Sequence, residues 1–257
     1  MNNPLYNRKI VVTRSRTQAA AFIEQIEKLG GLALPFPTVS IEDPQDWQAC
    51  DHALGNLSRF DWLVFTSFNG ANYFLKRLQE QGHDAVEAKI AAVGEKTAAA
   101  VRSFGFAVDL VPHEFSSEGI LRAFGDYDIK GKRFLLPTSN IGREALQKGL
   151  EETGARVDKL VVYRTAANRL VDAKDMRSRI KRRGVDCITF FSPSAFNFFI
   201  DIMGRTIIGD IAANSVQLAA VGPVTARAMQ REDLHVAIQA ERSHEDDLIR
   251  SLIDFYS

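Results

Sequence analysis

This 257-residue chain has no excess of charge of either sign, because 32 Lys and Arg residues balance 32 Asp and Glu residues. Nucleic acids and anionic membrane surfaces usually select a basic excess or a run of like charge, so the composition argues against both as partners. The sequence also lacks any apolar run near the roughly 20 residues that a membrane helix needs, and its amino terminus has no long apolar segment. These absences predict a cytoplasmic protein.

Cysteine and the common cofactor motifs are equally scarce. The two cysteines, Cys50 and Cys187, show no metal-ligand spacing, and we expect both to be reduced and buried. The five histidines show no mutual spacing that suggests catalysis. No GxGxxG follows a strand pattern, and neither GxxxxGKS nor GxxxxGKT occurs. Metal, dinucleotide and P-loop chemistry are therefore disfavoured, and no cofactor is expected.

What the chain does contain is a repeated corner. Ala91 to Ala98 reads AAVGEKTA, and Ala219 to Ala226 reads AAVGPVTA. Small apolar residues that end in Gly and lead into an apolar-periodic run are typical of a buried parallel strand that turns sharply into a helix. The free N–H groups of such a helix point past the carboxyl end of the sheet, where open α/β folds bind ligands.

The repeat extends beyond this corner. FTSFNGANYF around Ser67 resembles FFSPSAFNFF around Ser192, 125 residues later, and Ser116 and Glu118 pair with Ser243 and Glu245 at an offset of 127. The chain therefore contains two copies of one plan of roughly 125 residues. Duplication alone says nothing about function. The alternative is that polar strand ends from both copies face each other across a cleft.

Strand and helix patterns alternate along the chain, which predicts parallel sheets with helices on both faces. The expected strands lie at 9–12, 32–34, 62–65, 108–111, 133–136, 157–162 and 187–191, besides the strands of the two corners. Residues 137–140 are expected to form a polar turn, residues 143–152 a helix, and residues 243–256 the last helix.

The ordered set of motifs resembles the uroporphyrinogen-III synthase family. The motifs that carry this resemblance are Thr13-Arg14, FTSFNGA, AAVGEKTA, VPHEFSSEGIL, LLPTSNIGREAL, VVYRTA, FFSPSA and AAVGPVTA. None is decisive alone, but their order and spacing cover nearly the whole chain. The resemblance implies two α/β lobes, each a flavodoxin-like parallel sheet flanked by helices. It places lobe one at residues 1–37 plus 168–257, lobe two at 42–163, and two extended linkers at 37–41 and 163–167.

The resemblance also implies a reaction. The family dehydrates and cyclises hydroxymethylbilane, a linear tetrapyrrole with eight carboxylates, to uroporphyrinogen III with inversion of ring D, in heme and siroheme biosynthesis. Such a lyase should act mainly by holding a strained spiro geometry, with mild acid help to the departing hydroxide. A monomer in transient contact with the preceding pathway enzyme is expected. The alternative is a two-lobed binding protein that closes on a small anionic ligand without chemistry.

The resemblance implies Tyr163 as the candidate proton donor. Tyr163 is a phenol at the end of an otherwise aliphatic strand, and a phenol group can donate a proton in general acid catalysis. The alternative is a packed aromatic ring with a solvated hydroxyl. The expected substrate-binding residues are Thr13, Arg14, Ser67, Asn69, Thr97, Ser117, Arg143, Arg164, Ser192, Ser194 and Thr225. Helix capping is the alternative for Ser67, Ser192, Ser194, Thr97 and Thr225. The arginines and Lys96 could pair with substrate carboxylates, and a solvated helix face is the alternative for them. Lys96 has the least support, because Val224 takes its place in the second corner.

Overall fold

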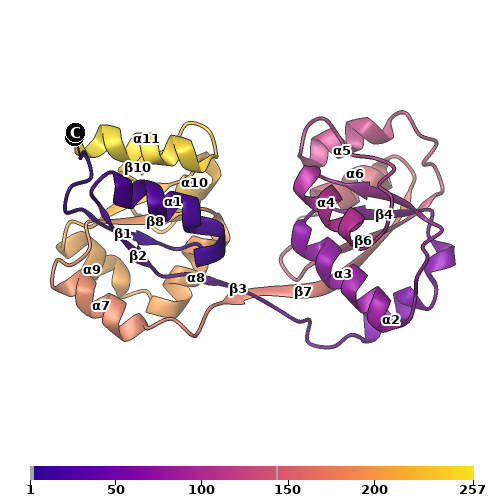
Figure 1. The fold of residues 1–257 in the computed structure, drawn as a ribbon, viewed down its shortest axis with the longest axis horizontal. Coiled ribbons are helices and arrows are strands. Elements are labelled where there is room, and N and C mark those ends of the chain that lie inside the picture. The colour runs from indigo at the N-terminus through magenta and orange to yellow at the C-terminus, as the bar shows by residue number, and fades with distance from the viewer. Residues whose placement is uncertain (1–2, 143) are drawn as a thin grey trace. The chain divides into compact units, whose positions relative to one another are not determined.

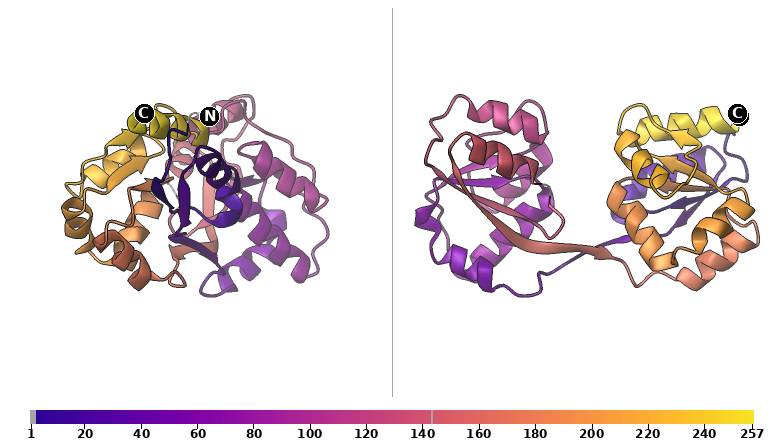
Figure 2. Two further views of the ribbon diagram at one scale, coloured as in Figure 1. Left: turned by 60° about the vertical axis from the view of Figure 1, so that its left-hand side comes forward. Right: turned by 180° about the vertical axis from the view of Figure 1, so that it is seen from behind.

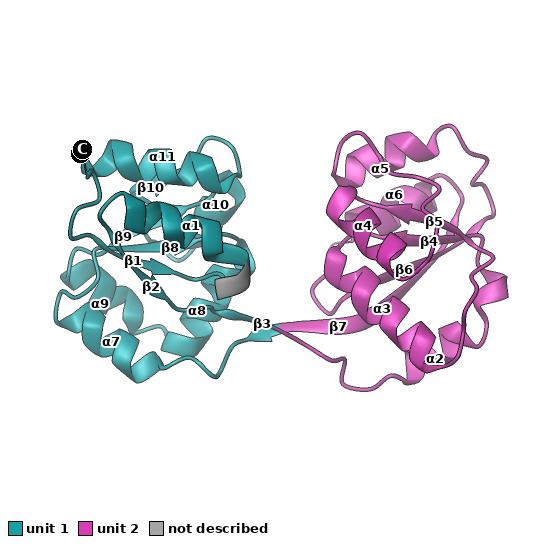
Figure 3. Cartoon of the chain, viewed as in Figure 1, with its two compact units in different colours: residues 1–40, 166–257 teal, residues 41–165 magenta. Residues whose placement is uncertain are grey.

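The structure is a computed structural model that describes residues 3–142 and 144–257. The chain forms two compact units, which are unit 1, Met1–Ser40 with Ala166–Ser257, and unit 2, Ile41–Thr165 (Figure 3). It passes from one unit to the other within two strands, β3 (Val39–Glu42) and β7 (Arg156–Ala167), which are neighbours in one sheet. The expected linkers at 37–41 and 163–167 overlap these two strands.

Unit 1 contains a five-stranded sheet in which every pair of neighbouring strands is parallel. The strands, in spatial order, are β2 (Leu32–Pro35), β1 (Lys9–Val12), β8 (Cys187–Phe190), β9 (Gln217–Ala220) and β10 (Ile238–Gln239). Its helices are α1 (Arg16–Lys28), α7 (Ala173–Lys181), α8 (Pro193–Met203), α9 (Ile207–Ala213), α10 (Pro223–Gln230) and α11 (Glu245–Tyr256). Numbered along the chain, the order is 2-1-3-4-5, which is the flavodoxin order.

The two faces of this sheet bury different side chains, because successive strand residues point to opposite faces. Ile10 and Val12 pack with α1 and α11 in one core cluster. Val11 and Ile188 pack with α7, α8, α9 and α10 in another. The sheet is therefore covered by helices on both faces, as Figures 1 and 2 show.

Unit 2 follows a closely related plan, with strands in the order β3-β7-β6-β4-β5. Its strands besides β3 and β7 are β4 (Trp62–Phe65), β5 (Lys89–Ala92) and β6 (Arg133–Ser139). Its helices are α2 (Gln48–Leu54), the 3-10 helix η1 (Leu57–Arg59), α3 (Phe68–Glu80), α4 (Glu95–Ser103), α5 (Ser117–Phe124) and α6 (Ala145–Glu152). The β4–β5, β4–β6 and β6–β7 pairs are parallel. Helices α2, α3 and α4 cover one face, and α5 and α6 cover the other.

The internal repeat corresponds to this arrangement. Ser67 and Ser192 follow β4 and β8, and the two AAVG corners begin in the last two residues of β5 and β9. When β4 is matched to β8 and β5 to β9, β6 and β7 take the places of β1 and β2. Four strands of each sheet therefore have the same spatial order, although the chain runs through them from different starting strands. The fifth strand lies at opposite edges, with β3 beside β7 in unit 2 and β10 beside β9 in unit 1. The fold class that the alternation predicts is confirmed.

Three expected elements differ from the structure. Residues 108–111 form only a single bridge, between Leu110 and Ala91, because the Asp109 carboxylate accepts the Ile90 N–H at 2.7 Å and takes the place of a strand carbonyl. The expected turn at 137–140 is mostly strand, since β6 continues to Ser139. The last helix begins at Glu245, with His244 rather than Ser243 at its N-cap. The elements missed by the sequence patterns are α2, η1, α7, α9, β3 and β10.

No helix in the described parts of the chain is both long enough and apolar enough to span a lipid bilayer.

Candidate active site

Each sheet has one point where the chain connections diverge to opposite faces, and ligands of open α/β sheets bind at the carboxyl ends of the strands there. In unit 2 this point lies between β4 and β6, because α3 leads from β4 over one face and α6 leads from β6 over the other. In unit 1 it lies between β8 and β1. The two carboxyl edges are called the unit 2 edge and the unit 1 edge below.

At the unit 2 edge, a serine and a tyrosine hydroxyl lie within hydrogen-bond distance. The Ser67 Oγ lies 3.3 Å from the Tyr163 hydroxyl oxygen, and either group can be the donor. Ser67 is the N-cap of α3, and its Oγ also accepts the Gly70 backbone N–H at 3.0 Å. When Ser67 donates its own hydrogen to Tyr163, the phenolic hydrogen stays available for a ligand. Helix capping and a contact with the candidate acid thus coexist at Ser67.

A β-bulge directs Tyr163 towards Ser67. The register of β6 against β7 shifts between Thr138 and Ser139, so Thr138 pairs with Val161 and Ser139 pairs with Tyr163. The extra residue places Val162 and Tyr163 in the same core cluster, although neighbours in a regular strand point to opposite faces. Without the bulge, the Tyr163 ring would leave the face on which α3 begins.

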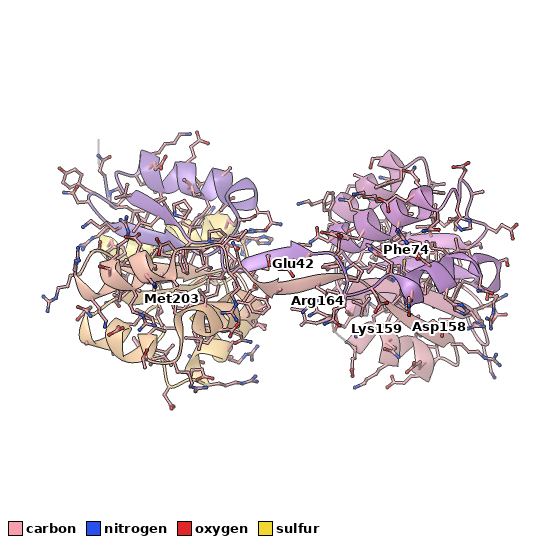
Figure 4. All side chains as sticks on the ribbon, turned by 90° about the horizontal axis from the view of Figure 1, so that it is seen from below. Glu42, Phe74, Asp158, Lys159, Arg164 and Met203 are labelled. Atoms are coloured by element: carbon pink, nitrogen blue, oxygen red, sulfur yellow. The ribbon has the colours of Figure 1, made fainter. Side chains whose placement is uncertain are left out.

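Tyr163 is buried, and its surroundings are aromatic. Its side chain is only 8% exposed, and its ring lies 5.6 Å from the ring of Tyr73 on α3. Burial is the main cause that raises the pKa of Tyr73, and the nearby Asp43 and Glu42 carboxylates add to it. Arg164 is half-buried next to Tyr163 on β7, farther along the strand than Asp158 and Lys159 (Figure 4).

At the unit 1 edge, Ser192 and Ser194 lie together. Ser192 is the N-cap of α8 and accepts the Ala195 backbone N–H at 3.1 Å. Its Oγ is 3.0 Å from the Ser194 Oγ. Pro193 occupies the first turn of α8, where a proline suits the helix start. The equivalent corner of unit 2, with Ser67 before α3, has the same capping geometry.

Arg14 also lies at the unit 1 edge, but its charge is already paired. Its guanidinium donates to Glu245 in the first turn of α11 and lies 5.5 Å from the centre of the Phe191 ring. Partial burial lowers the pKa of Arg14. A ligand carboxylate at Arg14 would therefore compete with Glu245.

All three expected threonines are buried inside their units. Thr13 is fully buried, and its hydroxyl donates to the Thr189 carbonyl at 2.8 Å, so its side chain is part of the β1–β8 packing. Thr97 and Thr225 are 4% and 3% exposed and occupy the third position of α4 and α10. The N-caps of these helices are Gly94 and Gly222, so the interpretation of the two threonines as caps is wrong.

The remaining expected residues are more scattered. Asn69 lies in the first turn of α3, and Ser117 is the first residue of α5, whose N-cap is Ser116. Arg143 lies outside the described residues. Sequence reasoning missed Tyr73 and the pairing of Glu245 with Arg14. The only signal was the pairing of Glu245 with Glu118 in the repeat, and Tyr73 carried no separate pattern.

Within the part of the chain that the structure describes, no three His, Cys, Asp or Glu side chains are grouped so that they could hold a metal ion. Cys50 and Cys187 are both buried and unbridged. Burial raises the pKa of the Cys50 thiol to about 12 and also raises that of Cys187. The two thiols are therefore protonated at neutral pH, a form that binds metals and electrophiles poorly.

Comparison with known proteins gives a consistent result. A family model described as uroporphyrinogen-III synthase HemD matches residues 20–250. The uroporphyrinogen-III synthase of Synechococcus elongatus is 28% identical over 97% of this chain and 96% of its own length. That of Chlorobaculum parvum is 27% identical over 90% of this chain and 92% of its own length.

Solved structures agree with this in fold. A mutant uroporphyrinogen III synthase from Thermus thermophilus matches with a TM-score of 0.64 at 20% identity, and covers 96% of this chain and 98% of its own. A uroporphyrinogen-III synthetase from Helicobacter pylori also has a TM-score of 0.64, at 17% identity, with 96% and 99% of the two chains covered. Since the family model spans most of the sequence, the chain belongs to the uroporphyrinogen-III synthase family.

Proposed function

We propose that this protein converts hydroxymethylbilane to uroporphyrinogen III, with loss of water and inversion of ring D. The family membership supports the reaction, and one observation supports the place where it occurs. A protic pair, Ser67 and Tyr163, lies at the carboxyl edge of a parallel sheet beside the point where the chain connections diverge. That pair is suited to assist a departing hydroxide.

In the proposed first step, the pyrrole nitrogen of the terminal ring pushes out the hydroxyl group, and the carbon–oxygen bond breaks. The Tyr163 hydroxyl gives its proton to the departing oxygen, which leaves as water. Ser67 donates to the Tyr163 oxygen and stabilises the phenolate that forms, while the Gly70 N–H fixes Ser67 at 3.0 Å. After cyclisation, the intermediate gives a proton to the Tyr163 phenolate, which restores the neutral phenol.

The rest of the proposed catalysis is positioning. The azafulvene that follows dehydration can close directly to the isomer without inversion, so the protein has to hold the strained spiro arrangement instead. We propose that backbone N–H groups at the starts of α3 and α8, with Arg164 and Arg14, bind the substrate carboxylates. The unit 1 edge and the unit 2 edge would then each contribute to substrate affinity.

The decisive test is an isomer assay. The protein is mixed with freshly prepared hydroxymethylbilane, the products are oxidised, and the porphyrin isomers are separated. We expect isomer III far above a protein-free blank. A product mixture with only isomer I above the blank would refute the enzymatic function and favour a binding protein.

The ion pair at the unit 1 edge gives a separate prediction. If Arg14 binds a substrate carboxylate, Glu245→Gln should lower KM by about two- to fivefold, because the competing charge is removed from a half-exposed pair whose strength is modest. Steady-state kinetics with hydroxymethylbilane measure this, and kcat should stay unchanged.

The neighbouring Asp246→Asn is the matched control, because Asp246 contacts Gln25 at 3.2 Å rather than Arg14. Both changes remove one negative charge from the first turn of α11, so a general charge effect would appear in both variants. An increase of KM in Glu245→Gln alone would mean that Glu245 holds Arg14 in its binding position.

Salt dependence tests how the polyanionic substrate is recognised. The chain is neutral overall, so local N–H groups and a few cations should matter more than a long-range basic field. We expect KM to rise by no more than about threefold between roughly 50 and 300 mM NaCl, a range in which exposed charges become strongly screened. A rise of more than tenfold would reveal a strong basic field at the site.

We also propose that the protein acts as a monomer in the cytoplasm. The support for this compartment is the pair of buried, unbridged cysteines in a cysteine-poor chain. Light scattering of the purified protein during gel filtration measures its mass, and 28.6 kDa is expected.

A further inference from the structure

Two exposed phenylalanines lie at the unit 2 edge. Of the 17 phenylalanines in the chain, three are exposed, namely Phe68 at 39%, Phe115 at 66% and Phe255 at 45%. Phe68 follows Ser67 and begins α3, and Phe115 directly precedes Ser116, the N-cap of α5. Phenylalanine is usually buried, so two exposed rings beside a candidate active site call for an explanation.

The turn at the start of α4 contacts both rings, through Lys96 and Gly94. The Lys96 Nζ lies 5.1 Å from the centre of the Phe68 ring, within the range of a cation–π contact. Lys96 is in the first turn of α4, whose N-cap is Gly94. The Phe115 ring lies against Gly94, since a Cβ placed on that glycine would be 3.5 Å from the Phe115 Cγ. We call Phe68, Gly94, Lys96 and Phe115 the Phe68–Phe115 face.

This face is continuous with the proposed catalytic pair. Ser67, which lies 3.3 Å from the Tyr163 hydroxyl, is the residue next to Phe68. Gly94 has a φ of 93°, a backbone conformation that residues other than glycine rarely adopt. Because Gly94 has no side chain, the Phe115 ring packs directly against its backbone. The unit 2 edge thus combines two exposed aromatic rings, the Lys96 ammonium group and the hydroxyl pair of Ser67 and Tyr163.

The chemistry of the face selects its ligand. Exposed rings favour another flat, apolar ring system, and the ammonium group beside them favours a carboxylate attached to it. A purely apolar partner would leave Lys96 unpaired, and a purely ionic ligand would leave both rings in water. The complementary molecule carries aromatic rings with carboxylates around their edges.

We propose that the Phe68–Phe115 face binds pyrrole rings of the substrate and that Lys96 pairs with one of the carboxylates on those rings. The inference rests on the proposed function and deepens it, because it assigns ring contacts to particular residues. Phe68, being next to Ser67, contacts the ring closest to the departing hydroxide. Phe115 contacts a ring farther along the substrate.

Two probes test the face without turnover. Uroporphyrin I carries pyrrole rings with eight carboxylates, whereas butane-1,2,3,4-tetracarboxylate has carboxylates and no ring. Phe68→Ala and Phe115→Ala should each weaken uroporphyrin I binding by about two- to tenfold, the range of one aromatic contact, and leave tetracarboxylate binding unchanged. Lys96→Gln should weaken both probes. Porphyrin fluorescence follows the first probe, and displacement of the porphyrin follows the second.

Phe255→Ala is the matched control, because the exposure of Phe255 lies between those of Phe68 and Phe115 but Phe255 is on α11 of unit 1. It should bind both probes like the unmodified protein. Phe68→Tyr and Phe115→Tyr keep a flat ring and should retain most of the affinity. Thermal unfolding of each variant verifies that the fold is intact.

Several results would overturn the inference. Porphyrin binding within about 1.5-fold of the unmodified protein in both Phe→Ala variants would show that the rings lie off the ligand. Loss of self-association in these variants, measured by sedimentation, together with unchanged porphyrin binding, would assign the face to a second copy of the chain. If the unmodified protein fails the isomer assay but its porphyrin binding depends on both rings, the proposed enzymatic function is refuted, and the role of the Phe68–Phe115 face in ring binding is retained.

Discussion

Tyr163→Phe should lower the rate of uroporphyrinogen III formation by about 10²–10⁴-fold, which is the usual contribution of a positioned general acid. The change keeps the ring, and with it the contact to Tyr73 at 5.6 Å and nearly all of the packing. It removes only the hydroxyl that lies 3.3 Å from Ser67. Single-turnover kinetics with hydroxymethylbilane measure the chemical step, and thermal unfolding should show nearly unchanged stability.

The loss should not be complete. Ser67, Arg164 and the backbone N–H groups would still position the substrate, and spontaneous dehydration would still supply the azafulvene. The surviving product should therefore remain enriched in isomer III over the blank. Tyr73→Phe is the matched control, since it removes a hydroxyl from the adjacent ring and should change the rate by less than about twofold.

Two outcomes would contradict the role given to Tyr163. A rate within about twofold of the unmodified enzyme would leave Tyr163 as a packing residue and assign the acid to a bound water or a substrate carboxylate. Formation of isomer I alone by a folded variant would mean that Tyr163 holds the substrate geometry and does not donate the proton.

The fold class was accessible from the sequence because its signals are local. Alternating strand and helix patterns, with serines and glycines at the corners, indicate parallel sheets. The structure confirms Ser67, Ser116 and Ser192 as N-caps, each accepting a backbone N–H from the residue three positions later. Such capping involves only neighbouring residues, so it can be read from a short stretch.

The site geometry was accessible only in part, because it depends on contacts between distant segments. Strict alternation along β7 places Val162 and Tyr163 on opposite faces, and the bulge that brings them together comes from the register against β6. The Arg14–Glu245 pair joins residues 231 positions apart. Neither a register shift nor a distant ion pair leaves a periodic pattern in one sequence.

Thr97 and Thr225 show that the exact start of a helix is also hard to predict from the sequence. Both follow a glycine by three positions, and a threonine near a helix start suggests a cap. The chain instead turns into the helix at the glycine, which moves the threonine into the third helical position and buries it. The precise residue at which a helix begins therefore decided between a surface role and a buried one.

Gly70→Ala should reduce both stability and activity, because the start of α3 lies directly against β6. A Cβ at Gly70 would be 2.8 Å from the Pro137 carbonyl oxygen and 3.1 Å from the Ser67 Oγ. A backbone oxygen inside a sheet cannot move aside easily, so α3 must shift away from β6. Overpacking of this kind typically costs about 1–3 kcal/mol. For a chain of this size, each kcal/mol lowers Tm by about 2–4 °C.

The same shift should reach the proposed acid. The Gly70 N–H holds Ser67, and Ser67 contacts Tyr163, so a displaced α3 changes the distance between the two hydroxyls. Misplacement of catalytic groups by about 1 Å can cost on the order of 10²-fold in rate. We therefore expect kcat to fall by about 10- to 100-fold at temperatures where the variant is folded.

Gly209→Ala separates this effect from that of adding a methyl group to any helix. Gly209 lies within α9, where a Cβ would meet no atom within 4 Å, so alanine should leave activity unchanged and raise stability by up to about 1 kcal/mol. If Gly70→Ala retains both the Tm and the rate of the unmodified protein, α3 is free to adjust, and the position of Ser67 does not limit catalysis. If Tm falls while kcat stays constant, the contact with Pro137 is structural only, and the link from Gly70 through Ser67 to Tyr163 is wrong.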